Sequence, residues 1–219
     1  MSLNPEFVEN PETRCPVVLL LDTSHSMKLG INQLNTGVAT FKEELERDDT
    51  ASVRVEVAII TFNSKVEKVQ NFVTIDQFQP PTLEARGATE MGRAIEMALD
   101  EVEDRKVIYR EHGITYYQPW VFLITDGAPT DDWKNAARRV KEAVEARKLC
   151  FYAVGVRGAD MECLRCIAHH DNRPEMLDGL KFRELFCWLS ASMKRVSTSK
   201  VGEQQVKLPP ISGWATVTT

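Results

Sequence analysis

The sequence predicts a single α/β domain built on a doubly wound, mostly parallel sheet with helices on both faces. Three apolar runs, at 17–22, 119–126 and 150–156, are almost continuously hydrophobic, as expected for parallel strands that are covered on both sides. Between the strands lie stretches in which apolar residues recur with helical spacing. Strands that alternate with helices favour right-handed crossovers, and therefore this fold class.

Two further strands are expected. The run at 53–62 predicts one of them. After the short polar turn "NSK", the segment 66–75 predicts an antiparallel edge strand that forms a hairpin with it. We divide the chain into an N-terminal extension (1–13), the α/β domain (14–198) and a C-terminal tail (199–219) that packs on the domain.

Helices are expected where apolar residues form a stripe. The three clearest stripes are Met91, Ala94, Ile95, Ala98, Leu99 and Val102; Trp133, Ala136, Ala137, Val140, Ala143 and Val144; and Phe182, Leu185, Phe186, Leu189, Met193 and Val196. Weaker helices are expected at about 34–47 and 160–168. The stripes predict packing surface. The irregular connection at 76–91 interrupts the alternation, and long connections are often functional.

Composition excludes several classes of protein. The chain has 219 residues and a formal net charge of -5, with no cluster of basic residues, which argues against binding to nucleic acid or to an acidic membrane surface. No apolar run is long enough to span a bilayer, and the N-terminus lacks the pattern of a signal peptide. The five cysteines form no regular framework, which favours reduced thiols in the cytoplasm.

Oxygen-bearing side chains mark the ends of two predicted strands. Asp22 ends the first strand and is followed by Ser24 and Ser26, whereas Asp126 ends the fourth. Thr89 lies in the long connection, where the next helix begins. Ligands of open parallel sheets bind beyond the carboxyl ends of the strands. If the first and fourth strands are neighbours, these residues converge on one edge of the sheet.

The residue types suit a hard cation. Carboxylates and hydroxyls form an all-oxygen set of the kind that binds an ion of the size of Mg²⁺. In an extended turn after Asp22, alternate residues point the same way, so we expect Ser24 and Ser26 to reach one ion while His25 does not. Hydroxyls are neutral, so an open coordination position would attract a carboxylate from another molecule.

These motifs carry a family resemblance. "DTSHS" at 22–26, Thr89 in "RGATEM" and Asp126 in "LITDG" together resemble the metal-ion-dependent adhesion site (MIDAS) of von Willebrand factor A-type (VWA) domains. The resemblance covers roughly residues 14–198. It implies a Rossmann-like fold and a non-enzymatic module that holds Mg²⁺ (or Mn²⁺ or Ca²⁺) through Asp22, Ser24, Ser26, Thr89 and Asp126. It also implies a partner protein that supplies an Asp or Glu to the metal. Family members very often have Gly at the position of His25.

The C-terminal part resembles one branch of this family. "FRELFCWLSASMKRVSTSK" and the later "LPPISGW" are similar to the bacterial intracellular branch of YegL-like and tellurite-resistance-associated A-domain proteins. This resemblance implies a role in stress signalling, with a kinase or a phosphatase as partner.

Other interpretations of the same residues stay open. Each of the five site residues, taken singly, is also typical of a strand end, a turn or a helix cap. A magnesium-dependent phosphoryl-transfer enzyme would also place an aspartate after an apolar strand, but it needs a second acid and a lysine where "DTSHS" offers hydroxyls. The chain also lacks a phosphate-binding P-loop motif and the G-x-S-x-G motif. A structural subunit with a vestigial site is the third alternative.

Two polar clusters have simpler explanations. Asp131 and Asp132 precede the Trp133 helix, and N-capping explains them better than metal ligation. Cys163, Cys166, His169 and His170 in "CLRCIAHHDN" suggest zinc, which takes about four tetrahedral ligands. These residues crowd onto one helix and its exit, so the pattern argues against a zinc site there.

Overall fold

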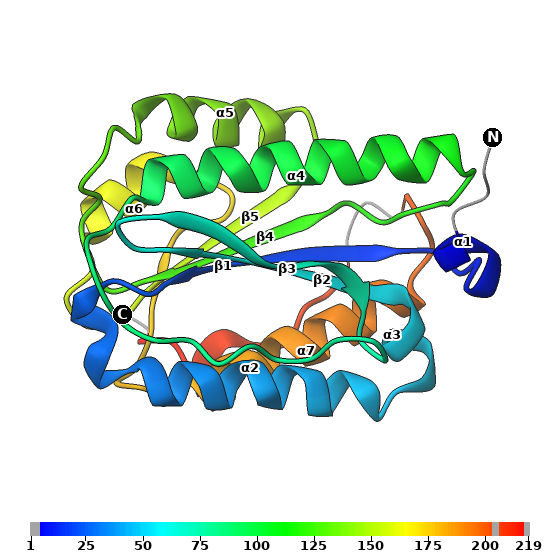
Figure 1. Ribbon diagram of the computed structural model, residues 1–219, viewed down its shortest axis with the longest axis horizontal. Coiled ribbons are helices and arrows are strands. Elements are labelled where there is room, and N and C mark those ends of the chain that lie inside the picture. Colours follow the sequence, from blue (N-terminus) through cyan, green and yellow to red (C-terminus); the bar gives the residue numbers. More distant parts are fainter. Residues whose placement is uncertain (1–4, 203–205, 217–219) are drawn as a thin grey trace.

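Figure 1 shows the computed structural model, which describes residues 5–202 and 206–216. A six-stranded sheet with the order β3-β2-β1-β4-β5-β6 forms its centre. The strands are β1 (Cys15–Asp22), β2 (Val55–Phe62), β3 (Val66–Thr74), β4 (Trp120–Thr125), β5 (Cys150–Gly155) and β6 (Glu175–Met176). Every neighbouring pair is parallel except β2 and β3. The predicted doubly wound sheet with one antiparallel edge strand is therefore confirmed.

Helices cover both faces of the sheet (Figure 1). On one face lie α4 (Met91–Glu111), α5 (Lys134–Glu145) and α6 (Met161–Ile167), and on the other α2 (Ile31–Glu46), α3 (Asp49–Arg54) and α7 (Phe182–Thr198). The short helix α1 (Pro5–Glu9) lies at the amino end of β1, and η1 (His25–Leu29) and η2 (Ile211–Gly213) are 3-10 helices. None of the helices in the described ranges combines the length and apolarity that a membrane crossing requires.

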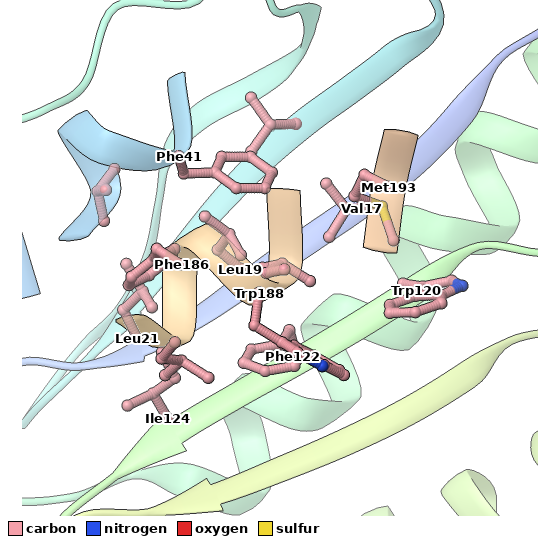
Figure 2. Packing of buried hydrophobic residues seen from close by; sticks show 14 of the residues in the cluster. Val17, Leu19, Leu21, Phe41, Trp120, Phe122, Ile124, Phe186, Trp188 and Met193 are labelled. Atoms are coloured by element: carbon pink, nitrogen blue, oxygen red, sulfur yellow. The ribbon is translucent and has the colours of Figure 1, made fainter. Parts of the chain in front are cut away.

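Alternation along β1 divides the core into two layers. Val18 and Leu20 pack on the face of α4, α5 and α6, and Val17, Leu19 and Leu21 on the face of α2 and α7. All five are fully buried. Figure 2 shows the second layer, where side chains of β1 and β4 meet aromatic and apolar residues of α2 and α7. A strand covered on both sides holds its end residue firmly, and in β1 that residue is Asp22.

Helices α2 and α7 approach each other closely at Gly37. A β-carbon at this position would lie 2.4 Å from Cδ2 of Phe186, so only glycine fits there without displacing the ring. Both helices were expected from their apolar spacing, whereas this close approach depends on the tertiary packing.

The segment before β2 differs from the expectation. Residues 53–54, predicted as strand, belong to α3. The helix forms because Asp48 caps it, accepting hydrogen bonds from the backbone N–H groups of Thr50 (3.2 Å) and Ala51 (2.9 Å). The strands β2, β4 and β5 also begin or end up to two residues inside the predicted ranges. Such short shifts are typical of element ends.

The described part of the C-terminal tail lies against α7 and β6. The indole Nε1 of Trp188 donates to the Pro209 carbonyl oxygen at 2.8 Å, and Trp214 is 3% exposed. Leu177 and Ala215 form an isolated antiparallel bridge. The predicted extension and tail also include residues 1–4, 203–205 and 217–219, which lie outside the described residues.

Candidate metal centre

The sheet order brings the carboxyl ends of β1 and β4 together. Leu21 and Ile124 are partners in the β1–β4 ladder, so the chain leaves the sheet at the same level after both strands. This meets the condition under which the sequence placed Asp22 and Asp126 at a common edge. In Figure 1 this edge lies on the left, where β1 turns into η1 and α2.

A chain of hydrogen bonds joins four of the predicted site residues. The backbone N–H of Ser24 donates to Oδ1 of Asp22 at 2.7 Å. The hydroxyl oxygens of Ser24 and Ser26 are 3.0 Å apart, and the Ser26 hydroxyl donates to Oδ1 of Asp126 at 2.6 Å. Two aspartates separated by about a hundred residues of chain thus share one cluster of oxygen atoms.

Thr89 approaches this cluster from the connection before α4. The Thr130 backbone N–H donates to the Thr89 carbonyl oxygen at 2.9 Å, and the Thr130 hydroxyl oxygen accepts from the Thr89 N–H at 3.2 Å. A β-carbon at Gly127 would lie 3.4 Å from Oγ1 of Thr89 and 3.8 Å from Oγ of Ser26. Because both hydroxyls border this small space, Thr89 joins the same edge without a direct hydrogen bond to the other site residues in the described structure.

The turn after Asp22 is not extended throughout, so the predicted alternation is wrong beyond Ser24. Ser24 has an extended backbone, with ψ of 168°, and serves as the N-cap of η1. Ser26 lies inside η1 and reaches Asp126 from a helical turn. His25 is exposed, and its backbone N–H donates to the Gly87 carbonyl oxygen at 3.0 Å. The hydroxyls converge because the 3-10 turn folds Ser26 back over Ser24.

Thr125 is a site residue that the sequence reasoning missed. It is fully buried, and its hydroxyl donates to Oδ2 of Asp22 at 2.6 Å. Both oxygens of the Asp22 carboxylate therefore accept a hydrogen bond. The available signal was its place directly before Asp126, at the end of the neighbouring strand.

Asp131 and Asp132 hold the connection between β4 and α5 in place. Asp132 accepts a hydrogen bond from the N–H of Lys134, the first residue of α5, at 3.0 Å, but the N-cap position itself is Trp133. Asp131 instead caps α4, because its carboxylate accepts from the backbone N–H groups of Gly92 (3.0 Å) and Arg93 (2.8 Å). The prediction that both cap the Trp133 helix is therefore wrong for Asp131. This contact ties the segment after Asp126 to the helix that follows Thr89.

Both carboxylates lie in a poorly solvated place without a basic partner. Asp22 is fully buried and Asp126 is 8% exposed. Burial raises the pKa of Asp22 to about 6, against the opposing effect of hydrogen bonds from Ser24 and Thr125. Burial also raises the pKa of Asp126. Among residues 5–202 and 206–216, no lysine, arginine or histidine forms an ion pair with either of them. A cation would supply the missing positive charge.

The sheet order and the oxygen-rich edge define a doubly wound α/β domain with a candidate cation site. Comparison with known families identifies the kind of domain. Residues 17–179 match the von Willebrand factor type A domain family. The match covers most of the chain, and the chain belongs to this family.

Among curated relatives, the chain is 29% identical to matrilin-3 of Gallus gallus over 147 residues, which cover 63% of this chain and 30% of matrilin-3. Among solved structures it is similar to a von Willebrand factor type A protein from Catenulispora acidiphila, with a TM-score of 0.63, 17% identity, and coverage of 84% of this chain and 43% of that one. The chain thus spans less than half of either relative.

Two further structures share the fold. One is proximal thread matrix protein 1 from the mussel byssus with a zinc-occupied MIDAS motif (TM-score 0.57, 16% identity, 84% of this chain and 48% of that chain). The other is the pilus adhesin SpaC from Lactobacillus rhamnosus GG (TM-score 0.66, 15% identity, 84% of this chain and 30% of that chain). At these identities the likeness extends to the fold alone. VWA domains are typically adhesion or protein-interaction modules, and their MIDAS sites bind divalent cations.

Proposed function

We propose that this domain binds a partner protein through a divalent cation held at the carboxyl edge of the sheet. The cation is Mg²⁺ by preference, with Mn²⁺ or Ca²⁺ as alternatives, and an Asp or Glu of the partner completes its coordination. The predicted ligands, directly or through water, are Asp22, Ser24, Ser26, Thr89 and Asp126. The observation that carries the proposal is the pair of buried carboxylates without a basic partner, surrounded by hydroxyls.

The donor set explains the preference for a hard ion. Carboxylate and hydroxyl oxygens suit Mg²⁺, Mn²⁺ or Ca²⁺, whereas an ion that favours imidazole or thiolate finds no such ligand among the five. When bound, the ion acts as a Lewis acid that attracts a further anionic oxygen. Three of the five side chains are neutral, so this attraction is only partly satisfied within the domain.

Hydrogen bonds keep the donors in place. Thr125 and the Ser24 N–H fix the two oxygens of Asp22, and Ser26 fixes Asp126. Asp131 holds the connection after β4 against the N-terminus of α4. Preorganised donors lower the cost of assembling a binding site.

The finer assignment rests on the resemblance of the C-terminal part. We place the chain in the bacterial YegL-like and tellurite-resistance-associated branch, in the cytoplasm, with a kinase or phosphatase of a stress-signalling complex as its partner. The segments at 182–200 and 208–214 support this placement.

Calorimetric titration with MgCl₂ tests the site. The metal-free protein should bind one Mg²⁺, and Asp22→Ala should abolish binding. Asp104→Ala is the matched control, because Asp104 is exposed on α4 and should leave the titration unchanged. Undiminished Mg²⁺ binding by Asp22→Ala would refute the proposed site.

Affinity purification from the native cell tests the role of the ion in partner binding. Wild type should recover its partner in Mg²⁺ and lose it in EDTA, and Asp126→Ala should recover none. Equal recovery by wild type and Asp126→Ala would favour a structural subunit with a vestigial site. Turnover of phosphate esters by the pure protein that vanishes in Asp22→Asn would favour an enzyme instead.

A further inference from the structure

A second group of metal-ligating side chains lies in the loop between α6 and β6. His169, His170 and Asp171 each offer one ligand atom, and these atoms lie within 4.8 Å of one another. We propose that this loop binds a divalent transition-metal ion of the Zn²⁺ class, separately from the cation at the carboxyl edge. The inference is independent of the function proposed above, because it uses different residues and a different donor chemistry.

Each imidazole lies at the separation of two tetrahedral zinc ligands from one oxygen of Asp171. Bonds of about 2.0–2.1 Å to a tetrahedral Zn²⁺ place two ligand atoms about 3.3–3.4 Å apart. Nδ1 of His169 lies 3.4 Å from Oδ2 of Asp171, and Nε2 of His170 lies 3.3 Å from Oδ1, the other oxygen of the same carboxylate. The Asp171 side chain is 71% exposed, so it can turn to present one oxygen to an ion between the two imidazoles. The His170 side chain is 80% exposed, so it can rotate to adjust the remaining separation. Three protein ligands leave one position for water or another molecule.

The buried histidine supplies an independent observation. His169 is 5% exposed, and its Nε2 is buried without a hydrogen-bond partner. Its Nδ1 accepts a long hydrogen bond of 3.3 Å from the Asp171 backbone N–H, which leaves the ring proton on Nε2. A bound ion would take the Nδ1 lone pair in place of this hydrogen bond. The Glu145 carboxylate of α5 lies 3.9 Å from this Nε2. A metal-bound histidine usually donates its second N–H to such a carboxylate, which orients the ring.

The donor types separate this site from the carboxyl edge. Two imidazoles and one carboxylate favour Zn²⁺, Ni²⁺ or Cu²⁺, and Mg²⁺ does not compete well for imidazole. The two cysteines of the "CLRCIAHHDN" segment are not part of the cluster. Cys163 of α6 is buried in the core layer that this helix shares with α4 and α5, and Cys166 is exposed on α6. The proposed set keeps His169 and His170 of that sequence pattern and takes Asp171 in place of the two cysteines.

Binding would fix a loop that borders a cavity. Asp171 also lines a cavity of about 250 Å³ between the sheet, α7 and the C-terminal segment, together with Trp188 and Trp214. An ion at the loop would connect this wall of the cavity to α5 through Glu145. We therefore expect metal binding to protect the backbone amides at 168–174 from hydrogen exchange.

Calorimetry with ZnCl₂ in excess Mg²⁺ is the direct test. In this buffer, wild type stripped of other metals should bind one equivalent of Zn²⁺, and the Asp22→Ala variant should bind it equally well. His170→Ala and Asp171→Asn should lose it, while Glu145→Gln should weaken it roughly tenfold. His170 and Asp171 are exposed, so these two variants should fold normally.

The matched control is His25→Ala, which removes the exposed histidine beside the carboxyl edge and should leave the Zn²⁺ titration unchanged. Co²⁺ provides a second readout, because tetrahedral coordination gives a visible absorption band that His170→Ala should abolish. Zn²⁺ binding that survives His170→Ala, or that disappears in Asp22→Ala or in excess Mg²⁺, would overturn the proposal. So would the absence of Zn²⁺ binding to wild type.

Discussion

Two buried carboxylates at opposite ends of the sheet are compensated in different ways. Asp22 ends β1 and Glu56 lies near the start of the adjacent β2, where it pairs with Pro16. Six residues of strand separate the two levels, a distance of about 20 Å. Both side chains are fully buried. Within the part of the chain that the structure describes, Asp22 accepts hydrogen bonds from neutral groups alone, whereas Glu56 lies between two arginines.

The cluster around Glu56 is complete within the chain. Arg105 donates to both of its oxygens, from Nε at 3.0 Å and Nη2 at 2.8 Å, and the Tyr109 hydroxyl also donates to it. Nε of fully buried Arg14 lies 2.7 Å from Oε1, at an angle too bent for a hydrogen bond, so this contact is mainly charge attraction. Phe7 of α1 packs against both guanidinium groups.

The contrast separates a structural charge cluster from a candidate binding site. At the amino end, the chain provides the positive charge that a buried carboxylate requires. At the carboxyl end, the described residues provide oriented hydroxyls and no positively charged partner. Burial raises the pKa of Asp22 to about 6 because it disfavours the charged form. We take the missing positive charge as the chemical signature of a cation site.

The largest change in the free energy of unfolding is expected when Glu56 is replaced. Glu56→Gln removes the negative charge between two buried arginines, so the free energy of unfolding should fall by about 3–5 kcal/mol. Urea denaturation of the variant and wild type measures this loss. Glu67→Gln on the exposed face of β3 is the control and should change stability by less than about 0.5 kcal/mol. A similarly small change in Glu56→Gln would remove the contrast.

At Asp22, in contrast to Glu56, removing the negative charge should stabilise the metal-free protein. The pKa of Asp22 is higher in the folded protein than in the unfolded chain, so the folded state binds more protons between about pH 4 and pH 6. The stability of the metal-free protein should therefore fall as pH rises through this window, by up to about 3 kcal/mol.

Asp22→Asn should abolish this part of the pH dependence and stabilise the metal-free protein above pH 6. Thermal denaturation in EDTA between pH 4 and pH 8 measures both effects. Wild type should gain stability when Mg²⁺ is added, while the variant should not. A metal-free wild type whose stability does not fall between pH 4 and pH 6 would contradict the uncompensated charge.

An intermediate effect is expected at Thr125. Thr125→Val keeps the shape of this buried side chain and removes its hydrogen bond to Asp22. Stability should fall by about 1 kcal/mol, because one hydrogen bond is lost. Mg²⁺ affinity should fall roughly tenfold, because the Asp22 carboxylate is no longer oriented. Calorimetry and urea denaturation measure the two quantities, and an unchanged Mg²⁺ affinity would show that this hydrogen bond does not position the ligand.

The smallest effect is expected at His25. This residue is exposed, and only its backbone N–H has a described hydrogen bond, to Gly87. His25→Ala should change stability by less than about 0.5 kcal/mol and leave Mg²⁺ affinity within about twofold. A large loss of Mg²⁺ binding in calorimetry would assign the imidazole to the metal site.

The sequence predicted the central strands because they are long and apolar. The runs at 17–22, 119–126 and 150–156 have no competing interpretation once helices alternate with them. Short elements carried too little pattern: α1 has five residues and β6 has two. The predicted start of β2 is two residues too early because Asp48 caps a helical turn that extends to Arg54.

The sequence predicts the parts of the candidate metal centre that follow from the order of the strands. Asp22 and Asp126 follow neighbouring strands, so their meeting follows from the sheet order. Thr125 was missed because its role depends on the rotation of one side chain. The partners of Glu56 were also beyond prediction, because the alternation in "VRVEVAI" equally describes a charged residue that faces solvent. Two arginines from distant segments decide its environment.

The row of oxygens between the two aspartates has a fixed direction. The single hydroxyl proton of Ser26 is engaged by Asp126, so the contact between the serines has its proton on Ser24. Both serine hydroxyls thus donate toward Asp126, whereas the Ser24 backbone N–H donates to Asp22, and replacing either serine changes the hydrogen bonds that the other can form. The losses of Mg²⁺ affinity in Ser24→Ala and Ser26→Ala should therefore be non-additive. The double variant should bind Mg²⁺ only slightly more weakly than the weaker of the two single variants.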